Sequence, residues 1–403
     1  MPSPSAPTYF HIRALFLGLV FAALALLLAT PLAKLVERPY LRVLLADAFD
    51  EKDQGYALQH EAFSRDDVLP LYGSSEERSP SDSRAAVFFA HKPTGFQVCP
   101  VGARGNTTLM MAQKIAAQGT VVRGRKVAFI LSSTWFRRPT VPSSQVAGTF
   151  SPLQAITFLN SGELEPAMRQ RFVDRLASQI DSLAEQPMVA SRVLELAHPT
   201  AEGQSFFTSQ FRSVGLWSYH ARLTFEDHEN MVQRLLTDHS LFTSWAWKEE
   251  PRQIDWNTII QQLEKDTEVH RATWKPQKVM RPPGDDDAEI LALMKGAREW
   301  DDYALLLDTL KSLQAKALII SVPLPGWFMD PHGISRSCRD YFYHRIESMA
   351  ASRGFPAQTY SDHDQDRDFI EGVGTHLDVK GWMYVNRLLD DFYHDRLPTP
   401  SST

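Results

Sequence analysis

The stretch Leu69-Pro-Leu-Tyr-Gly-Ser-Ser-Glu76 is a short apolar run that ends in a turn of small residues. This pattern predicts a buried strand that enters a tight turn. A serine at such a turn is well placed to act as a nucleophile, although Gly-Ser-Ser is also common in ordinary surface turns. The rest of the chain therefore decides what this serine does.

Further apolar runs of the same kind predict the rest of a sheet. They lie at Phe96–Val101, Lys126–Leu131 and Ala317–Val322, with a shorter strand at Pro356–Tyr360. The first of them is followed by the glycine turn Gly102–Thr108 and by the good helix former Leu109–Ala117, which is typical of an α/β unit. Short continuous apolar strands suit a parallel sheet that helices cover on both faces. We therefore predict an α/β fold with a three-layer parallel sheet.

The section between the third and fourth strands, at about residues 140–315, has the apolar periodicity of helices. We interpret it as a large helical insertion carried by the sheet. A helix at Ser335–Arg353 and a last helix after His376 are expected to complete the fold.

Composition restricts the classes of function. The chain has 403 residues, 43% of them hydrophobic, so it can bury a large core. Its net charge of -6 and its pI near 6.1 give no reason to expect a nucleic-acid partner. Cys99 and Cys338 form neither a disulfide framework nor a metal cluster, and no phosphate-binding loop is present. We expect no metal and no cofactor.

The N-terminal region contains twenty uncharged, mostly apolar residues, Ala14–Ala33. This length predicts a membrane-spanning helix, and the poor small-residue cleavage site after it argues against a secretory signal peptide. We divide the chain into a membrane anchor, a helical stalk, a catalytic domain and a tail. Their ranges are 1–36, 37–66, 67–397 and 398–403.

The polar loop from Ser361 to Thr375 is rich in acidic residues and ends on His376, just before the last helix. Ser74 and Ser75 follow the first strand, and the carboxyl ends of parallel strands face one crevice. This is the layout of an SGNH-type hydrolase or acyltransferase. In such enzymes serine attacks an acyl carbonyl, histidine takes the serine proton, and backbone amides receive the oxyanion.

Six blocks in this order resemble the DltD family, membrane-anchored proteins of D-alanine transfer to lipoteichoic acid, and the resemblance covers nearly the whole chain. The blocks are the apolar N-terminus, Tyr72-Gly-Ser-Ser-Glu76, Gly102-Ala-Arg-Gly-Asn-Thr-Thr108, Ser132-Ser-Thr-Trp-Phe136, Val322-Pro323 with Gly326-Trp327, and His376-Leu-Asp-Val-Lys-Gly-Trp382. The resemblance implies that Ser75 is the nucleophile and that His376 is its base. It also implies a single-pass protein of the cell membrane with an extracytoplasmic catalytic domain and a membrane-bound O-acyltransferase as donor partner.

The chain departs from the family pattern at two places. The family has an aspartate three residues before the histidine, where this chain has Val373. Glu371 or Asp368 could orient the imidazole instead, or the site could work as a Ser-His dyad. In the glycine turn, the Gly105 amide is expected to form an oxyanion hole with the Ser75 amide, and the Asn106 side chain to add a donor.

The same turn leaves the role of Arg104 open between an ordinary surface arginine and a contact to an anionic acceptor. Trp135, Trp327 and Trp382 are interpreted first as packing at the crevice rim, and His332 as a residue that could line the site.

These patterns support three hypotheses of function. The first is a serine-dependent O-acyltransferase that passes an activated acyl group, by resemblance D-alanyl, through a Ser75 ester to a hydroxyl of a cell-envelope polymer. The second is an envelope polysaccharide O-acetyltransferase or esterase. The third is a scaffold that organises an acyl-transfer complex without catalysing.

Overall fold

Five parallel strands form one sheet in the order β2-β1-β3-β4-β5. The strands are β1 (Val68–Gly73), β2 (Gln97–Gly102), β3 (Lys126–Leu131), β4 (Lys316–Ser321) and β5 (Ala357–Gln358). Each coincides with a predicted apolar run, and the order is that of flavodoxin-like doubly wound sheets. The prediction of a parallel α/β sheet is confirmed.

The computed structural model describes residues 9–78, 81–198, 206–238, 250–275, 277–374 and 376–397. The predicted tail, residues 398–403, lies outside the described residues. Every structural statement below concerns the described part.

Strand β1 lies inside the sheet although it contains a proline. It pairs with β2 along its whole length, from Val68 to Gly73. It pairs with β3 only at Leu71 and Tyr72, beyond Pro70. Proline has no backbone N–H to donate, and the pairing on the β3 side begins only after it.

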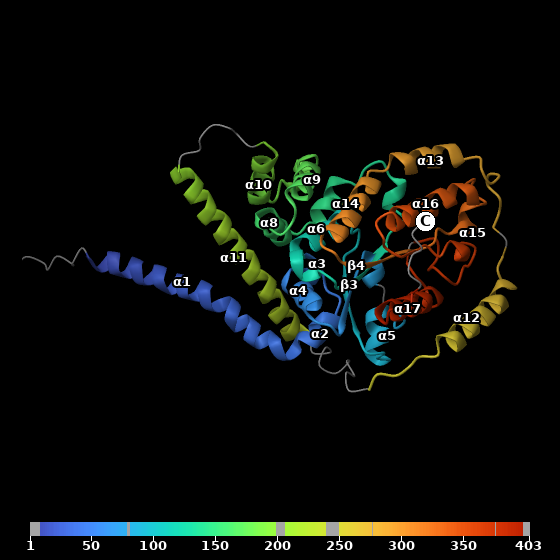
Figure 1. The fold of residues 1–403 in the computed structure, drawn as a ribbon, viewed down its shortest axis with the longest axis horizontal. Coiled ribbons are helices and arrows are strands. Elements are labelled where there is room, and N and C mark those ends of the chain that lie inside the picture. Colours follow the sequence, from blue (N-terminus) through green and yellow to red (C-terminus); the bar gives the residue numbers. More distant parts are fainter. Residues whose placement is uncertain are drawn as a thin grey trace, which may run out of the picture.

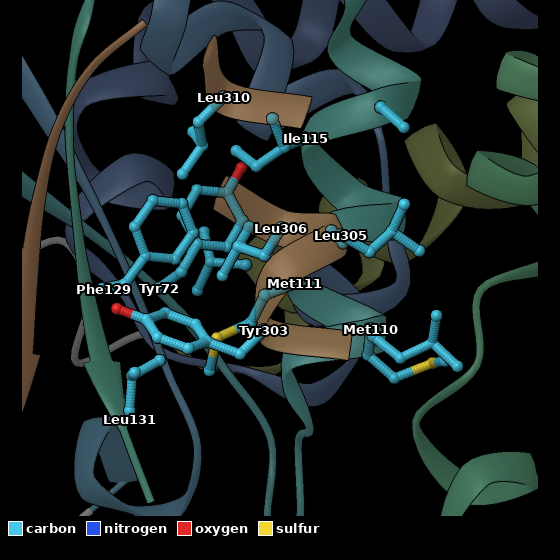
Figure 2. Packing of buried hydrophobic residues seen from close by; sticks show 14 of the residues in the cluster. Tyr72, Met110, Met111, Ile115, Phe129, Leu131, Tyr303, Leu305, Leu306 and Leu310 are labelled. Carbon is cyan, nitrogen blue, oxygen red and sulfur yellow. The ribbon is translucent and has the colours of Figure 1, made fainter. Parts of the chain in front are cut away.

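Side chains of the strands alternate between two buried clusters, one on each face of the sheet. In β3, Phe129 belongs to one cluster and Ile130 to the other. The first cluster packs the sheet against α6 (Thr108–Gln118), α14 (Glu299–Ser312) and α16 (Arg336–Ala351), and the second against α5 (Ala85–His91) and α17 (Val379–Tyr393). Figure 2 shows side chains of α6 and α14 around Tyr72 and Phe129, whose ring centroids are 5.4 Å apart. The three-layer prediction is therefore confirmed.

The sheet has a topological switch point between β1 and β3. The connection through α5 leads from β1 to β2 on one side, whereas β3, β4 and β5 extend the sheet in the opposite direction. Ligand sites of open α/β sheets lie beyond the carboxyl ends of the strands at such a point. The Gly-Ser-Ser turn follows β1 at this place.

The insertion between β3 and β4 is mostly helical in its described part, with loops such as residues 277–286 between the helices. Besides α14 it contains α7 (Ser143–Thr149), α8 (Pro152–Asn160), α9 (Pro166–Ala177), α10 (Pro187–Ala197), α11 (Phe206–Thr237), α12 (Trp256–Arg271) and α13 (Asp287–Gly296). Its helices pack on both faces of the sheet. Leu306 of α14 is buried in the first cluster, and Trp256 of α12 is buried in the second, so the insertion helps to cover both faces (Figure 1).

The N-terminal region differs from its prediction. Helix α1 (Tyr9–Glu37) contains the apolar run, but no helix in the described part of the chain combines the length and apolar character needed to cross a membrane. The predicted transmembrane helix is not supported.

Residues 37–66 are helical as expected but do not stand apart as a stalk. They form α2 (Leu41–Ala46), α3 (Asp50–Gln54) and α4 (Ala57–Ser64). Leu44, Leu45 and Phe63 are buried in the first core cluster. Because these apolar side chains pack into the main core, the sheet domain begins before the predicted residue 67.

Candidate active site

The structure brings Ser75 and His376 together. Ser75 opens a short 3-10 helix, η2 (Ser75–Arg78), directly beyond β1, and its Oγ lies 2.8 Å from His376 Nε2. Ser74 is only 2% exposed, and its Oγ accepts a hydrogen bond of 3.1 Å from the Gly105 N–H. Ser75, and not Ser74, is therefore the serine that contacts the imidazole.

A tight hairpin between β5 and α17 positions His376. Ile370 and Leu377 form an antiparallel bridge, and the Glu371 N–H donates to the His376 carbonyl oxygen at 2.9 Å. Gly372 in the hairpin has a φ of +58°, a conformation that costs glycine little. The hairpin thus explains why glycine surrounds the position where the family has an aspartate.

Glu371, the acid beside His376, makes no hydrogen bond to the imidazole. Glu371 Oε2 lies 3.9 Å from His376 Nδ1, which is beyond hydrogen-bond reach, and the Glu371 side chain is 67% exposed. Asp368, the other predicted acid, instead hydrogen-bonds His270 Nδ1 at 2.8 Å, so its predicted role does not fit the structure. Val373 is exposed. The arrangement is a Ser-His pair with an exposed glutamate nearby.

Buried charges tie the loop that carries His376 to its surroundings. Lys380 of α17 is 3% exposed, and its Nζ lies 2.5 Å from Asp366 and 2.9 Å from Glu264. Burial favours the neutral form of Asp366, but the neighbouring His363 and Lys380 outweigh this and lower the pKa of Asp366. Since Glu264 belongs to α12, the helical insertion helps to hold the histidine loop.

The glycine turn after β2 packs directly against the serine turn after β1. Gly73 and Gly102 are partners in the sheet register. A Cβ on Gly102 would lie 2.8 Å from the Ser74 carbonyl oxygen, so only glycine fits there without a shift. The two turns can approach each other closely because both strands end in glycine, which has no side chain.

Asn106 lies inside this support and cannot act as predicted. It is 1% exposed, and its Nδ2 donates to Asp53 Oδ1 at 2.9 Å and to the Gly73 carbonyl oxygen at 3.1 Å. Because both amide hydrogens are engaged, the predicted side-chain oxyanion donor is wrong. The Gly105 N–H is also engaged, with Ser74 Oγ, which does not fit an oxyanion role in this structure. Arg104 is exposed.

Sequence reasoning missed a buried ion pair beneath these turns. Lys114 Nζ and Asp53 Oδ2 lie 3.2 Å apart, and both side chains are at most 1% exposed. Lys114 Nζ also donates to Asn106 Oδ1 at 3.3 Å. The single lysine in the apolar helix 109–117 was a signal for such a partner, whereas Asp53 stands in a polar stretch that looks like surface.

Two acids directly after the serine are fully buried. The Glu76 side chain accepts the Ser74 N–H at 3.0 Å, and burial raises the pKa of Glu76 to about 7. Burial likewise raises the pKa of Glu77 to about 8, with the charge of Arg84 acting in the opposite direction. Glu76 belongs to the Gly-Ser-Ser-Glu block that the sequence singled out, but nothing in the sequence indicated that its side chain is buried.

The predicted rim residues have different surroundings. Trp382 is fully buried in the core, and Trp135 is buried with its Nε1 donating to the Asn106 carbonyl oxygen at 3.1 Å. Trp327 is half-buried, and the Arg367 guanidinium lies 4.8 Å from its ring centroid. His332 Nδ1 lies 2.7 Å from the carbonyl oxygen of Phe328, within its own loop. Of the three tryptophans, Trp327 fits a rim position best.

The chain is similar to proteins that share one name. The family profile described as DltD protein matches residues 46–281 and 285–394. Protein DltD of Bacillus subtilis is 23% identical over 350 residues, which cover 84% of this chain and 86% of that protein. Protein DltD of Staphylococcus aureus is 21% identical over 372 residues, which cover 92% of each. The matched ranges contain both the serine turn and the histidine hairpin.

Proposed function

This chain belongs to the DltD family, and on that premise we propose that it is a serine-dependent O-acyltransferase of the cell envelope. It moves an activated acyl group, D-alanyl by the family resemblance, to a hydroxyl of an envelope polymer. The observation that carries the proposal is the 2.8 Å contact between Ser75 Oγ and His376 Nε2 at the carboxyl edge of the sheet. The His376 side chain is 38% exposed, so a large acceptor has access to it.

The proposed reaction has two steps. In the first, His376 Nε2 takes the Ser75 proton while Oγ attacks the acyl carbonyl, and the donor leaves with that proton as an ester forms on Ser75. In the second, His376 takes the proton of an acceptor hydroxyl, whose oxygen attacks the ester carbonyl. The acyl group passes to the acceptor, and the proton returns to Ser75. The backbone N–H of Ser75 is the proposed oxyanion donor.

The donor and the location follow from the same proposal. An enzyme outside the cytoplasm has no direct access to cytoplasmic acyl carriers. We therefore propose that a membrane-bound O-acyltransferase delivers the activated acyl group and that the catalytic domain lies on the outer side of the membrane.

A fluorophosphonate serine probe tests the nucleophile. Ser75→Ala should abolish labelling, and His376→Ala should slow it by about a thousandfold. Ser352→Ala, which removes an exposed serine at the end of α16, should label like wild type. Equal labelling of the Ser75→Ala variant would refute the proposal.

Envelope polymers from cells that express Ser75→Ala test the substrate. Mass spectrometry should show the loss of alanyl esters. Loss of acetyl esters would assign the acetyltransferase function instead, and retained esters with an intact, folded variant would assign a scaffold.

A further inference from the structure

Glu76 lies behind the nucleophile and is joined to its turn. Its Oε2 accepts the N–H of Ser74, the residue that directly precedes Ser75, at 3.0 Å. Ser74 Oγ in turn accepts the Gly105 N–H at 3.1 Å. One carboxylate oxygen therefore anchors the serine turn, and through Ser74 this turn is linked to the glycine turn of β2.

The remaining carboxylate oxygens behind the turn have no hydrogen-bond partner in the described part of the chain. These are Glu76 Oε1 and both carboxylate oxygens of Glu77, and both side chains are 0% exposed. Two adjacent buried carboxylates resist ionising together. Because only Glu76 accepts a hydrogen bond through its carboxylate, it is the acid that ionises first.

The groups that face this pair cannot replace the Ser74 contact. They are Arg84 before α5, Lys52 of α3 and Cys99 of β2. Arg84 donates to the backbone carbonyl oxygen of Glu77, and Lys52 donates to the carbonyl oxygen of Leu45 at 3.1 Å. Both cations act on Glu77 by charge and lower its pKa. Burial raises the pKa of the Cys99 thiol, so this thiol stays neutral.

We propose that Glu76 is a positioning residue: its ionised carboxylate holds the Ser74–Ser75 turn, so that transfer at Ser75 requires an ionised Glu76. This inference rests on the proposed function. A hydrogen bond to a carboxylate is roughly twice as strong as one to a neutral acid. The glycine turn lies so close to the serine turn that a Cβ on Gly102 would be 2.8 Å from the Ser74 carbonyl oxygen. We expect that even a small shift of this tightly packed turn moves Ser75 Oγ relative to the imidazole.

The inference predicts a distinct pH profile. The pKa of Glu76 is raised to about 7, so Glu76 gains its proton as pH falls through neutrality. As Glu76 gains its proton, the labelling rate with the fluorophosphonate probe should fall. On a logarithmic plot, the slope of wild type at acid pH should be one unit steeper than that of a variant whose residue 76 cannot titrate.

Glu76→Gln is the decisive variant, because glutamine keeps an acceptor for the Ser74 N–H but cannot titrate. Its slope at acid pH should be one unit smaller than that of wild type, and its plateau rate should be about fivefold lower. Glu77→Gln is the matched control, since this neighbouring acid is equally buried but does not contact Ser74 through its carboxylate. The slope of Glu77→Gln should equal that of wild type. An unchanged, wild-type slope in Glu76→Gln would overturn the inference.

A measurement on the wild-type protein keeps the inference testable if Glu76→Gln does not fold. In the full chain labelled with ¹⁵N-serine, the amide resonance of Ser74, identified by its absence in Ser74→Ala, should titrate with a midpoint near 7. A resonance that does not change between pH 5.5 and 8.5 would refute the role of Glu76.

The two proposals fail in different ways. If Ser75→Ala still labels like wild type, the proposed function fails. If Ser75 is essential and the slope does not depend on Glu76, only the inference about Glu76 fails.

Discussion

Ser75 stands on a turn whose neighbours are almost wholly buried, whereas His376 stands on a hairpin that solvent reaches. Behind the serine, Glu76, Asn106 and Asp53 are at most 1% exposed, and each makes a hydrogen bond within the support. Beside the histidine, the Glu371 side chain is 67% exposed, and its carboxylate lies 3.9 Å from His376 Nδ1.

This difference teaches how the two halves of the site are positioned. The serine turn is held by buried polar contacts, which are strong in a medium of low dielectric and costly to break. The histidine hairpin is anchored at its base, where Lys380 pairs with Asp366 and Phe369 packs in the core. Its tip, around Val373, is exposed. The following variants test this comparison and are ordered by their expected effect on the rate of fluorophosphonate labelling.

Asn106→Ala removes the support of the serine turn and should have the largest effect. It leaves the Gly73 carbonyl oxygen without its Asn106 donor, and Asp53 loses a hydrogen bond. We expect the free energy of unfolding to fall by about 3 kcal/mol, and labelling to slow by about 100-fold because Ser75 is misplaced. Urea unfolding and labelling kinetics measure the two effects.

Asn160→Ala is the control for this variant, because Asn160 is exposed at the end of α8 and loses only an exposed hydrogen bond from Arg192. It should leave the labelling rate unchanged and lower the free energy of unfolding by less than about 1 kcal/mol. If Asn106→Ala labels as fast as wild type, the buried polar contacts do not position the serine.

Lys380→Met removes the tie at the base of the histidine hairpin and should have an intermediate effect. It leaves Asp366, which is 6% exposed, without its lysine partner. The expected loss is about 3 kcal/mol of unfolding free energy and about tenfold in labelling rate. Hydrogen exchange should rise in residues 361–374.

Lys311→Met, at an exposed position at the end of α14, serves as the reference for this change. An unchanged exchange pattern in Lys380→Met would show that the hairpin positions His376 without help from α12.

Glu371→Gln should have the smallest effect. An exposed ion pair contributes about 0–1 kcal/mol, so labelling should slow by less than about fivefold. The pH profile should keep its shape, because no hydrogen bond between Glu371 and His376 is lost. A decrease of 100-fold would instead show that Glu371 orients the imidazole during reaction.

Much of the sheet was predictable because its signals are local. The apolar runs around Leu71, Phe129 and Ile319 became strands at the expected places. Burial on both faces makes such strands continuously apolar, and this can be read from a few neighbouring residues. The packing of residues 37–66 into the main core could not be predicted, because helical periodicity shows which side of a helix is buried but not what buries it.

The site was predictable only in its two main residues. The Gly-Ser-Ser turn and His376 could be singled out from their positions beside predicted elements. Asn106 was assigned to the oxyanion hole, but its side chain is buried and bonds to Asp53 and Gly73. No local pattern places these segments together, since Asp53 and Asn106 are 53 positions apart in the chain.

The sequence by itself determined the parallel sheet, the serine turn after β1 and the histidine before α17, because each depends on residues that are close together in the chain. Only the tertiary structure decided that Ser75 rather than Ser74 meets His376 at 2.8 Å. It also decided that Glu76 is buried while Glu371 is exposed. The physical reason is that the environment of a carboxyl or hydroxyl group is made by segments far apart in sequence, and the cost of burying such a group depends on the partners that the fold provides.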